Sequence, residues 1–193
     1  MSKVEKTSFT AAEYLTMERQ SSEKHEFAFG EIFAMTGATA RHVGIVSNLV
    51  RELGNQLRHR PCQVYSADLR VCIDADNRYA YPDVVVVRNP PKFLDDTLDT
   101  LLNPELIVEV LSESTRNYDR GDKFQQYRGA PSFREYLLVD QEKFHVERYS
   151  KASDGTWSLW ETDSIDAVVR LESVGVALAV SEIYFKVDFE RPR

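Results

Sequence analysis

Two carboxylates stand in apolar surroundings, where an ionised side chain is costly. Asp83 follows a proline directly and opens a run of four valines, and Glu109 lies inside the apolar segment 106–111. A buried carboxylate must be paired, bound to a metal or protonated, because an isolated buried charge is strongly unfavourable. The residue types therefore leave two interpretations open: a metal site, or a buried ion pair with Arg70 or Arg88.

A third charged residue follows on a segment that is expected to be helical. Lys123 lies four residues after Asp119 and four residues before Tyr127. Side chains four residues apart are neighbours on a helix, so all three can share one face. If this helix packs across the ends of the acidic strands, the lysine can reach both carboxylates. The alternative is a surface Asp–Lys pair with no part in chemistry.

The histidines and cysteines argue against a zinc enzyme. The four histidines form neither an HExxH nor an HxxxH pair, and the two cysteines lack the CxxC spacing of zinc and redox motifs. Oxygen ligands from carboxylates suit harder ions such as Mg²⁺. We interpret the cysteines as reduced structural thiols.

Length and composition predict one domain, residues 1–193, that is large enough to bury a core, since 42% of the residues are hydrophobic. No apolar run approaches the roughly 20 residues that a membrane span needs, and the N-terminus lacks the apolar region of a secretory signal. These features predict a cytoplasmic protein that does not enter a membrane.

The net charge of −7 is unusual for a protein that binds nucleic acid over a broad surface. Any phosphate-binding surface must therefore be local. Two groups of basic residues around predicted helices are candidates, and each can equally be a solvated helix face. They are Arg41, Arg51, Arg58 and Arg60, and Arg116, Arg120, Lys123, Arg128 and Arg134.

Hydrophobic periodicity predicts a mixed α/β domain. Helices are expected at 11–19, from Arg41 to before Pro61, and at 119–128, with a last short one at 181–184. The first has a capping box, and the second has an apolar stripe at helical spacing. Strands are expected at 25–29 and 31–35 as a hairpin, at 64–73 with an offset near Ala67, at 84–87 and 106–111, and at 136–139, 144–149, 157–160 and 168–171. The continuous apolar runs 84–87 and 106–111 predict strands buried on both faces.

The order of these features resembles the PD-(D/E)XK nuclease superfamily and, within it, a large bacterial family of restriction-endonuclease-like proteins. The resemblance extends from Thr10 to Phe185. The segments that carry it are the hairpin Glu26–Met35, His42, Pro82-Asp83, Val108–Ser112, Asp119–Tyr127 and Glu135–Asp140.

The resemblance implies a restriction-endonuclease-like mixed central β-sheet flanked by helices, with additional C-terminal β-strands. It also implies that Asp83 and Glu109 bind Mg²⁺ or Mn²⁺ together with the main-chain carbonyl of the residue after the second acid. The superfamily has a lysine two residues after the second acid, where this chain has Leu111. Lys123 is expected to replace it from the following helix, as happens in some members. Glu31 and His42 are carried over as peripheral site residues, a further acid and a polar or phosphate contact.

The predicted function is therefore metal-dependent hydrolysis of phosphodiester bonds in nucleic acid, with DNA as the expected substrate and a homodimer as the expected assembly. Two alternatives stay open at this point. The absent lysine at position 111 can mean lost chemistry, which would make the protein a non-catalytic nuclease-fold dimer that acts as a binding or regulatory module. A hydrolase that acts on another phosphoester is also compatible with the residues.

Overall fold

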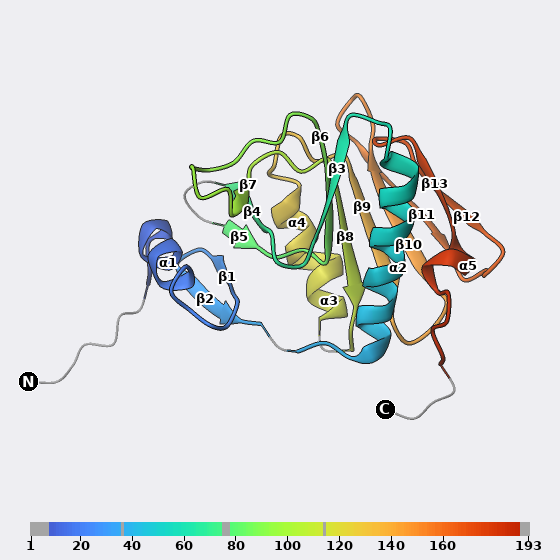
Figure 1. The fold of residues 1–193 in the computed structure, drawn as a ribbon, viewed down its shortest axis with the longest axis horizontal. Helices are drawn as coiled ribbons and strands as arrows, with labels where there is room; N and C mark the ends of the chain where they lie inside the picture. Colours follow the sequence, from blue (N-terminus) through green and yellow to red (C-terminus); the bar gives the residue numbers. More distant parts are fainter. Residues whose placement is uncertain (1–7, 36, 75–77, 114, 190–193) are drawn as a thin grey trace, which may run out of the picture.

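A computed structural model of the chain describes residues 8–35, 37–74, 78–113 and 115–189. Two sheets organise it (Figure 1). A six-stranded sheet in the order β11-β10-β9-β8-β6-β3 forms the body, and a five-stranded sheet in the order β2-β1-β5-β4-β7 lies beside it together with helix α1. A third sheet contains the C-terminal pair β12-β13. The mixed sheets flanked by helices, and the additional C-terminal strands, confirm the predicted fold class.

The six-stranded sheet contains β3 (Cys62–Ser66), β6 (Val84–Arg88), β8 (Leu106–Leu111), β9 (Glu135–Asp140), β10 (Val146–Lys151) and β11 (Trp157–Thr162). The five-stranded sheet contains β1 (His25–Ala28), β2 (Glu31–Ala34), β4 (Arg70–Asp74), β5 (Arg78–Ala80) and β7 (Thr100–Leu101), and the third sheet β12 (Val168–Leu171) and β13 (Val176–Ala179). The helices are α1 (Ala11–Glu18), α2 (Ala40–Leu57), α3 (Arg116–Tyr118), α4 (Phe124–Tyr127) and α5 (Val180–Ile183), and a π-helical turn, η1 (Asp119–Lys123), joins α3 to α4.

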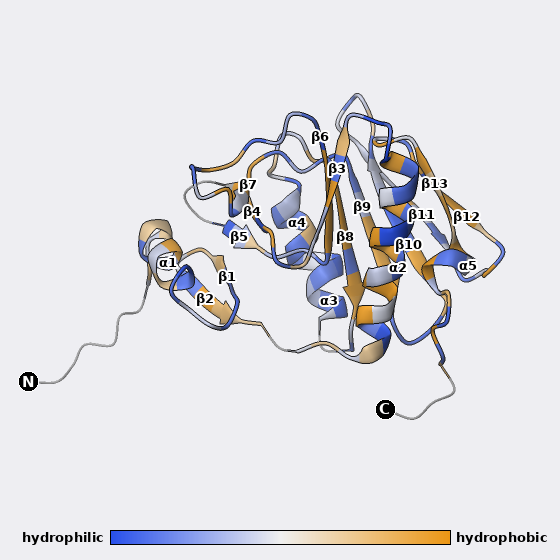
Figure 2. Cartoon of the chain, in the orientation of Figure 1, coloured by the Kyte–Doolittle hydropathy of each residue, from blue (hydrophilic) through white to orange (hydrophobic). Residues whose placement is uncertain are grey.

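The predicted helix starts are visible in the structure. The Thr10 side chain accepts from the N–H of Glu13, whose carboxylate accepts from the N–H of Thr10, so the predicted capping box opens α1. In α2 the stripe Ile45, Leu49, Leu53 and Leu57 is buried. Figure 2 shows this helix banded in hydrophobic and hydrophilic colours, because only one of its faces meets the sheet.

The centre of the six-stranded sheet is buried on both faces, as its apolar runs predicted. Val84 and Val86 pack in the core beneath α2, whereas Val85 and Val87 face the other core, which includes Phe124 and Tyr127 of α4. Strand β8 pairs with β6 antiparallel and with β9 parallel. One side of β8 therefore faces α2 and the other faces the segment 116–127.

The single strand predicted at 64–73 is wrong. The chain turns after β3, where the N–H of Leu69 donates to the carbonyl of Ser66, and β4 then joins the five-stranded sheet. Alternating hydrophobicity on both sides of the turn hid the change of sheet. The short strands β5, β7 and β13 were also not predicted, and the segment predicted as a helix from 119 begins at Arg116.

None of the helices in the described part of the chain combines the length and the apolar character needed to cross a membrane.

Candidate active site

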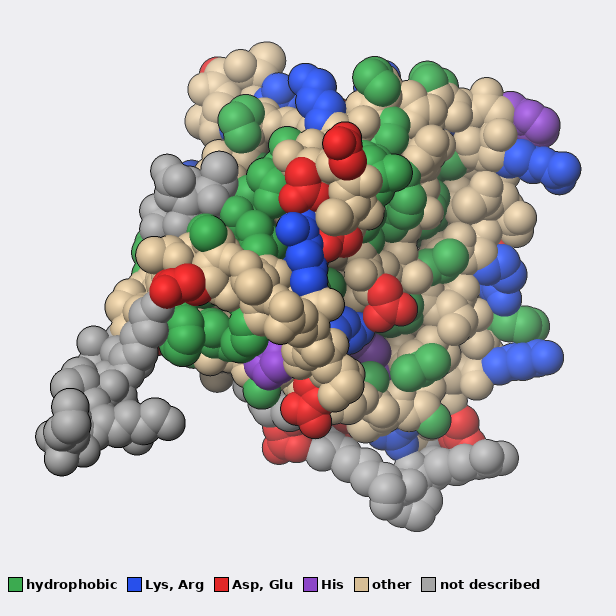
Figure 3. Space-filling view, turned by 60° about the vertical axis from the view of Figure 1, so that its left-hand side comes forward, with side chains coloured by type: hydrophobic (Ala, Val, Ile, Leu, Met, Phe, Trp, Pro, Cys, Tyr) green, Lys and Arg blue, Asp and Glu red, His purple; other side chains and the backbone are tan. Residues whose placement is uncertain are grey.

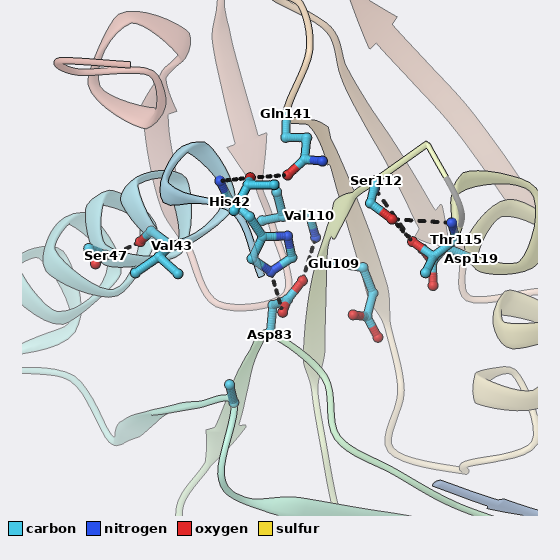
Figure 4. Close-up of polar contacts among 12 residues, drawn as sticks. His42, Val43, Ser47, Asp83, Glu109, Val110, Ser112, Thr115, Asp119 and Gln141 are labelled. Carbon is cyan, nitrogen blue, oxygen red and sulfur yellow. Dashed lines mark hydrogen bonds and ion pairs between the residues drawn. The ribbon is translucent and has the colours of Figure 1, made fainter. Parts of the chain in front are cut away.

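Asp83 and Glu109 come together because of the register between two central strands. In the antiparallel pair β6–β8, Val84 lies opposite Val108. Asp83, one residue before Val84, therefore lies opposite Glu109, one residue after Val108. Successive side chains in a strand alternate between faces, so Glu109 projects to the face that the segment 116–127 covers. The Asp83 carboxylate, just before the start of β6, points toward His42 and the N–H of Val110 (Figure 4).

Asp83 is held by two contacts. Its Oδ2 accepts a 2.7 Å hydrogen bond from the N–H of Val110, and its Oδ1 lies 2.9 Å from Nε2 of His42 (Figure 4). His42 lies in the first turn of α2, where its own N–H is capped by the Thr39 hydroxyl. The start of α2 thus places the His42 imidazole against the Asp83 carboxylate. The same carboxylate accepts the main-chain hydrogen bond of Val110, as a neighbouring strand would.

Glu109 is buried, with 4% of its surface exposed, and has a cation within contact distance. Its Oε1 lies 3.0 Å from Nζ of Lys123 and accepts a 2.7 Å hydrogen bond from the Tyr127 hydroxyl. The structure therefore joins Glu109 to two of the three residues that were predicted to share a helix face. The third, Asp119, has its Oδ1 3.7 Å from Nζ of Lys123.

The segment that carries Lys123 is not a regular α-helix. Residues 119–123 form a π-helical turn in which both Asp119 and Lys123 are buried. The Tyr136 hydroxyl donates to the carbonyl of Asp119 and ties this turn to β9. Single π-helical turns are frequent at functional sites, and here the turn faces the acidic ends of β6 and β8.

A fourth acid enters the site from the other sheet. Oε1 of Glu26, on β1, lies 3.1 Å from Nζ of Lys123. We use the name acidic cluster for Glu26, Asp83, Glu109, Asp119 and Lys123. Glu26 escaped prediction because an acid on one face of a hairpin strand has the pattern of an ordinary solvated residue. Glu31, which was predicted instead, is exposed at the start of β2 and makes none of the contacts that join Lys123 to its carboxylates.

The acidic cluster holds more negative than positive charge. Burial raises the pKa of the Glu109 carboxyl well above its ordinary value, and Asp83, Asp119 and Glu26 raise it further against the opposing effect of Lys123. Burial also raises the pKa of Asp119. Burial by itself would lower the pKa of Lys123, but Glu109, Glu26 and Asp119 reverse this effect and raise it well above its ordinary value. Lys123 is thus a permanent cation that does not balance the acids around it.

This donor set fits a hard divalent cation that completes its coordination with water. Within the described ranges, no three His, Cys, Asp or Glu side chains are grouped so that they could hold a metal by themselves. Mg²⁺ is commonly bound by only one or two carboxylates and keeps several waters. The neighbouring carboxylates Asp83 and Glu109 meet that requirement, and the excess negative charge favours a cation between them.

Several of the basic residues that are candidates for a phosphate-binding surface are paired with acids. Arg120 contacts Glu147 at 2.6 Å and Arg41 contacts Glu142 at 3.1 Å. Arg51 is likewise within 3.3 Å of Glu182. Figure 3 shows basic and acidic side chains interspersed on the face that it draws. A substrate phosphate would therefore meet single basic groups and not a continuous basic surface.

Comparisons with known proteins agree with this architecture. The family model "Uma2: Putative restriction endonuclease" matches residues 11–181. The chain is 43% identical over 152 residues to "Uncharacterized protein sll1609" of Synechocystis sp., which covers 79% of this chain and 86% of that protein. It is 37% identical over 177 residues to "Uncharacterized protein slr1290" of the same organism, with 92% of each covered.

A similar fold occurs in a crystal structure described as "a putative nuclease belonging to DUF820" from Anabaena variabilis. The TM-score is 0.75, and the match covers 91% of this chain and 97% of that chain. Since only 18% of the residues are identical, this likeness concerns the fold.

Proposed function

Because the chain belongs to the Uma2 family, as its resemblance to restriction-endonuclease-like proteins predicted, we propose that it is a metal-dependent nuclease that hydrolyses phosphodiester bonds in DNA. One observation carries the proposal: the buried Lys123 ammonium lies 3.0 Å from a carboxylate oxygen of Glu109, and Asp83 directly precedes Val84, which pairs with the residue before Glu109. A lysine that contacts the second acid is part of the arrangement that the superfamily resemblance led us to expect.

Asp83 and Glu109 would hold Mg²⁺ or Mn²⁺. When bound, such an ion activates water and stabilises negative charge that develops on a phosphate. The Lys123 ammonium would orient the attacking water or stabilise charge on the phosphate, because a fixed cation in a buried site acts strongly on developing charge. The Tyr127 hydroxyl and the His42 ring hold the two carboxylates in place from opposite sides of the sheet.

The charge of the acidic cluster also makes substrate binding depend on the cation. The phosphate backbone of DNA is negatively charged. Four carboxylates with only one ammonium would repel it. A divalent cation offsets two of those negative charges. DNA should therefore approach the site only after the cation has bound, and the scattered basic side chains would act on the more distant phosphates.

Cleavage of a supercoiled plasmid with Mg²⁺ or Mn²⁺ tests the proposal, with EDTA as the metal-free reference. Wild type should cleave and Asp83→Ala should not. Calorimetry with Mn²⁺ should show binding that Asp83→Ala loses. Asp96→Ala is a matched control, because Asp96 is an exposed acid of the loop before β7. Binding and cleavage that are equal in wild type and Asp83→Ala would exclude the proposed site.

The assembly can be measured in the same assay. We propose a homodimer, because two active sites related by a two-fold axis can cut both strands of a duplex. Linear product should then appear without accumulation of the nicked circle, and sedimentation should give twice the mass of the chain. If Asp83 binds Mn²⁺ but DNA is not cut, RNA and other phosphoesters are the next substrates to test.

A further inference from the structure

Glu26 contacts the site through two hydrogen-bond donors. Its Oε1 lies 3.1 Å from Nζ of Lys123 and accepts a 3.3 Å hydrogen bond from the N–H of Tyr81. The Glu26 side chain is only 13% exposed. Tyr81 stands two residues before Asp83 in the chain. One carboxylate oxygen therefore connects the lysine on η1 to the segment that leads into the first acid.

Glu26 belongs to a different sheet from the two strand acids. Strand β1 pairs with β5, where Phe27 lies opposite Tyr79. Strand β5 ends at Ala80 and leads directly into the Tyr81 segment. The position of Glu26 is thus set by the five-stranded sheet and does not depend on the helical segment that carries Lys123.

Lys123 and a divalent cation would compete for one oxygen. Oε1 of Glu109 already contacts Nζ of Lys123 and the Tyr127 hydroxyl. An ion bound to this carboxylate repels the ammonium, because both are positive. Asp119 offers a weaker alternative at 3.7 Å and lies on the same helical turn as the lysine. Glu26 lies at nearly the same distance from Nζ as Glu109 does, so it can hold the ammonium without Glu109.

We propose that Glu26 is a positioning residue that retains the Lys123 ammonium at the site when a divalent cation takes over Glu109. This inference rests on the proposed role of Asp83 and Glu109 as cation ligands. It makes the hairpin of the second sheet part of the active centre, because the lysine would otherwise leave the site with the arrival of the ion.

The order of the Lys123 side chain is the direct readout. Relaxation of its ¹³Cε nucleus is measured without metal and with saturating Mg²⁺, and the signal is assigned by its loss in Lys123→Arg. Glu26→Gln keeps the shape and an acceptor for Tyr81, so the fold is retained. Glu26→Asp keeps the charge but shortens the side chain by one methylene, which moves the carboxylate away from the Lys123 ammonium. Glu23→Gln is the matched control, because Glu23 is an exposed acid shortly before β1.

In wild type and Glu23→Gln, the lysine should stay ordered with and without Mg²⁺. In Glu26→Gln and Glu26→Asp it should be ordered without metal and mobile with Mg²⁺, and the single-turnover cleavage rate at saturating Mg²⁺ should fall about tenfold or more. A purely stabilising ion pair would lower the melting temperature without this dependence on metal.

The two proposals fail in different ways. If wild type binds Mg²⁺ through Asp83 and Lys123 of Glu26→Gln stays ordered with Mg²⁺, the positioning role of Glu26 is overturned and the nuclease proposal stands. If calorimetry finds no Asp83-dependent Mg²⁺ binding, the proposed function is overturned. The proposed role of Glu26 is then overturned as well, because it requires that cation.

Discussion

Two clusters of charged residues in the described part of the chain meet at Tyr81. The main-chain N–H of Tyr81 donates to Glu26 of the acidic cluster, whereas its hydroxyl donates to Glu18 at 3.0 Å. The second cluster, which we name the arginine cluster, lies in and around the five-stranded sheet. It contains Glu18, Arg19, Arg70, Tyr81, Asp99 and Thr100.

The arginine cluster has matched charges. Arg70 is 2% exposed and contacts Asp99 at 3.0 Å, Thr100 at 3.0 Å and the Tyr81 hydroxyl at 3.1 Å. Arg19 reaches the same Asp99 from α1 at 2.8 Å. The hydrogen bond from Arg19, assisted by Arg70, holds the pKa of Asp99 well below its ordinary value.

The carboxyl pKa values therefore shift in opposite directions in the two clusters. Asp99 is stabilised as an anion by two guanidinium groups, whereas Glu109 gains proton affinity from burial and from its acidic neighbours. A network that serves only the fold is stable when its charges are balanced. A site that binds a cation needs carboxylates whose negative charge is not already balanced by neighbouring cations. The contrast between the clusters supports the proposal that the acidic cluster is the functional one.

Removing the buried cation from each cluster tests most directly whether the two clusters differ. Arg70→Met should lower the free energy of unfolding by about 3 kcal/mol, because it removes the hydrogen bonds of the guanidinium to Thr100 and Tyr81 and one of the two cations at Asp99. Lys123→Met should also destabilise the fold, but Mn²⁺ should restore much of the loss, since it binds the native state and offsets the same carboxylates. Urea unfolding with and without Mn²⁺ measures both. Equal rescue of Arg70→Met by Mn²⁺ would remove the distinction.

The next largest effect concerns cleavage. Lys123→Ala should lower the cleavage rate about 100-fold or more, because the lysine acts on the charge that develops in the transition state. The Mn²⁺ affinity should be retained or increase, because the ammonium that competes with the ion for Glu109 is removed. Lys123→Arg should recover only part of the rate, since a planar guanidinium does not replace a compact ammonium. Lys143→Ala, at an exposed lysine, is the control. Wild-type cleavage by Lys123→Ala would favour the non-catalytic alternative.

The opposite pKa shifts predict opposite responses to pH. Because the folded-state pKa of Glu109 is raised, protons compete with Mn²⁺ above the ordinary glutamate value of about 4.3, and Mn²⁺ affinity should increase as the pH rises through the raised pKa. In the metal-free protein the same group contributes stability at low pH that is lost as the pH rises.

Asp99 has a lowered pKa, so its contribution to stability is present above its ordinary value and is lost as the pH falls. Calorimetry with Mn²⁺ at a series of pH values follows Glu109, and urea unfolding at the same pH values follows Asp99. The Asp99→Asn variant should lose the acidic part of the stability profile and keep the pH dependence of Mn²⁺ affinity. A flat Mn²⁺ affinity across pH would show that Glu109 is not a ligand.

The smallest expected effects come from the two tyrosine hydroxyls. Tyr127→Phe removes a 2.7 Å hydrogen bond to Glu109, and Tyr81→Phe removes the hydrogen bond to Glu18 and the one accepted from Arg70. Each loss should amount to about 1 kcal/mol. Tyr127→Phe should weaken Mn²⁺ binding at neutral pH, because the hydroxyl favours the ionised carboxylate, whereas Tyr81→Phe should lower stability alone. A loss of Mn²⁺ affinity in Tyr81→Phe would show that the clusters are coupled through Tyr81.

The elements that could be predicted from the amino-acid sequence are those whose signals are local. Helix α1 follows from its capping box, α2 from a stripe at helical spacing, and β6 and β8 from apolar runs that only a doubly covered sheet can bury. Asp83 and Glu109 were recognisable because an acid next to such a run needs a partner. Lys123 and Tyr127 were recognisable from their spacing on one helix face. All of these inferences depend on residues a few positions apart.

The way in which distant segments combine could not be predicted from these local signals. The assignment of β3 and β4 to different sheets, the register that sets Asp83 against Glu109 and the arrival of Glu26 from β1 depend on pairing between segments that are far apart in the chain. The balance of charge in each cluster is decided in the same way, because it depends on which side chains share a buried volume. Local periodicity predicts that a side chain will be buried, but it does not identify the residues that surround it.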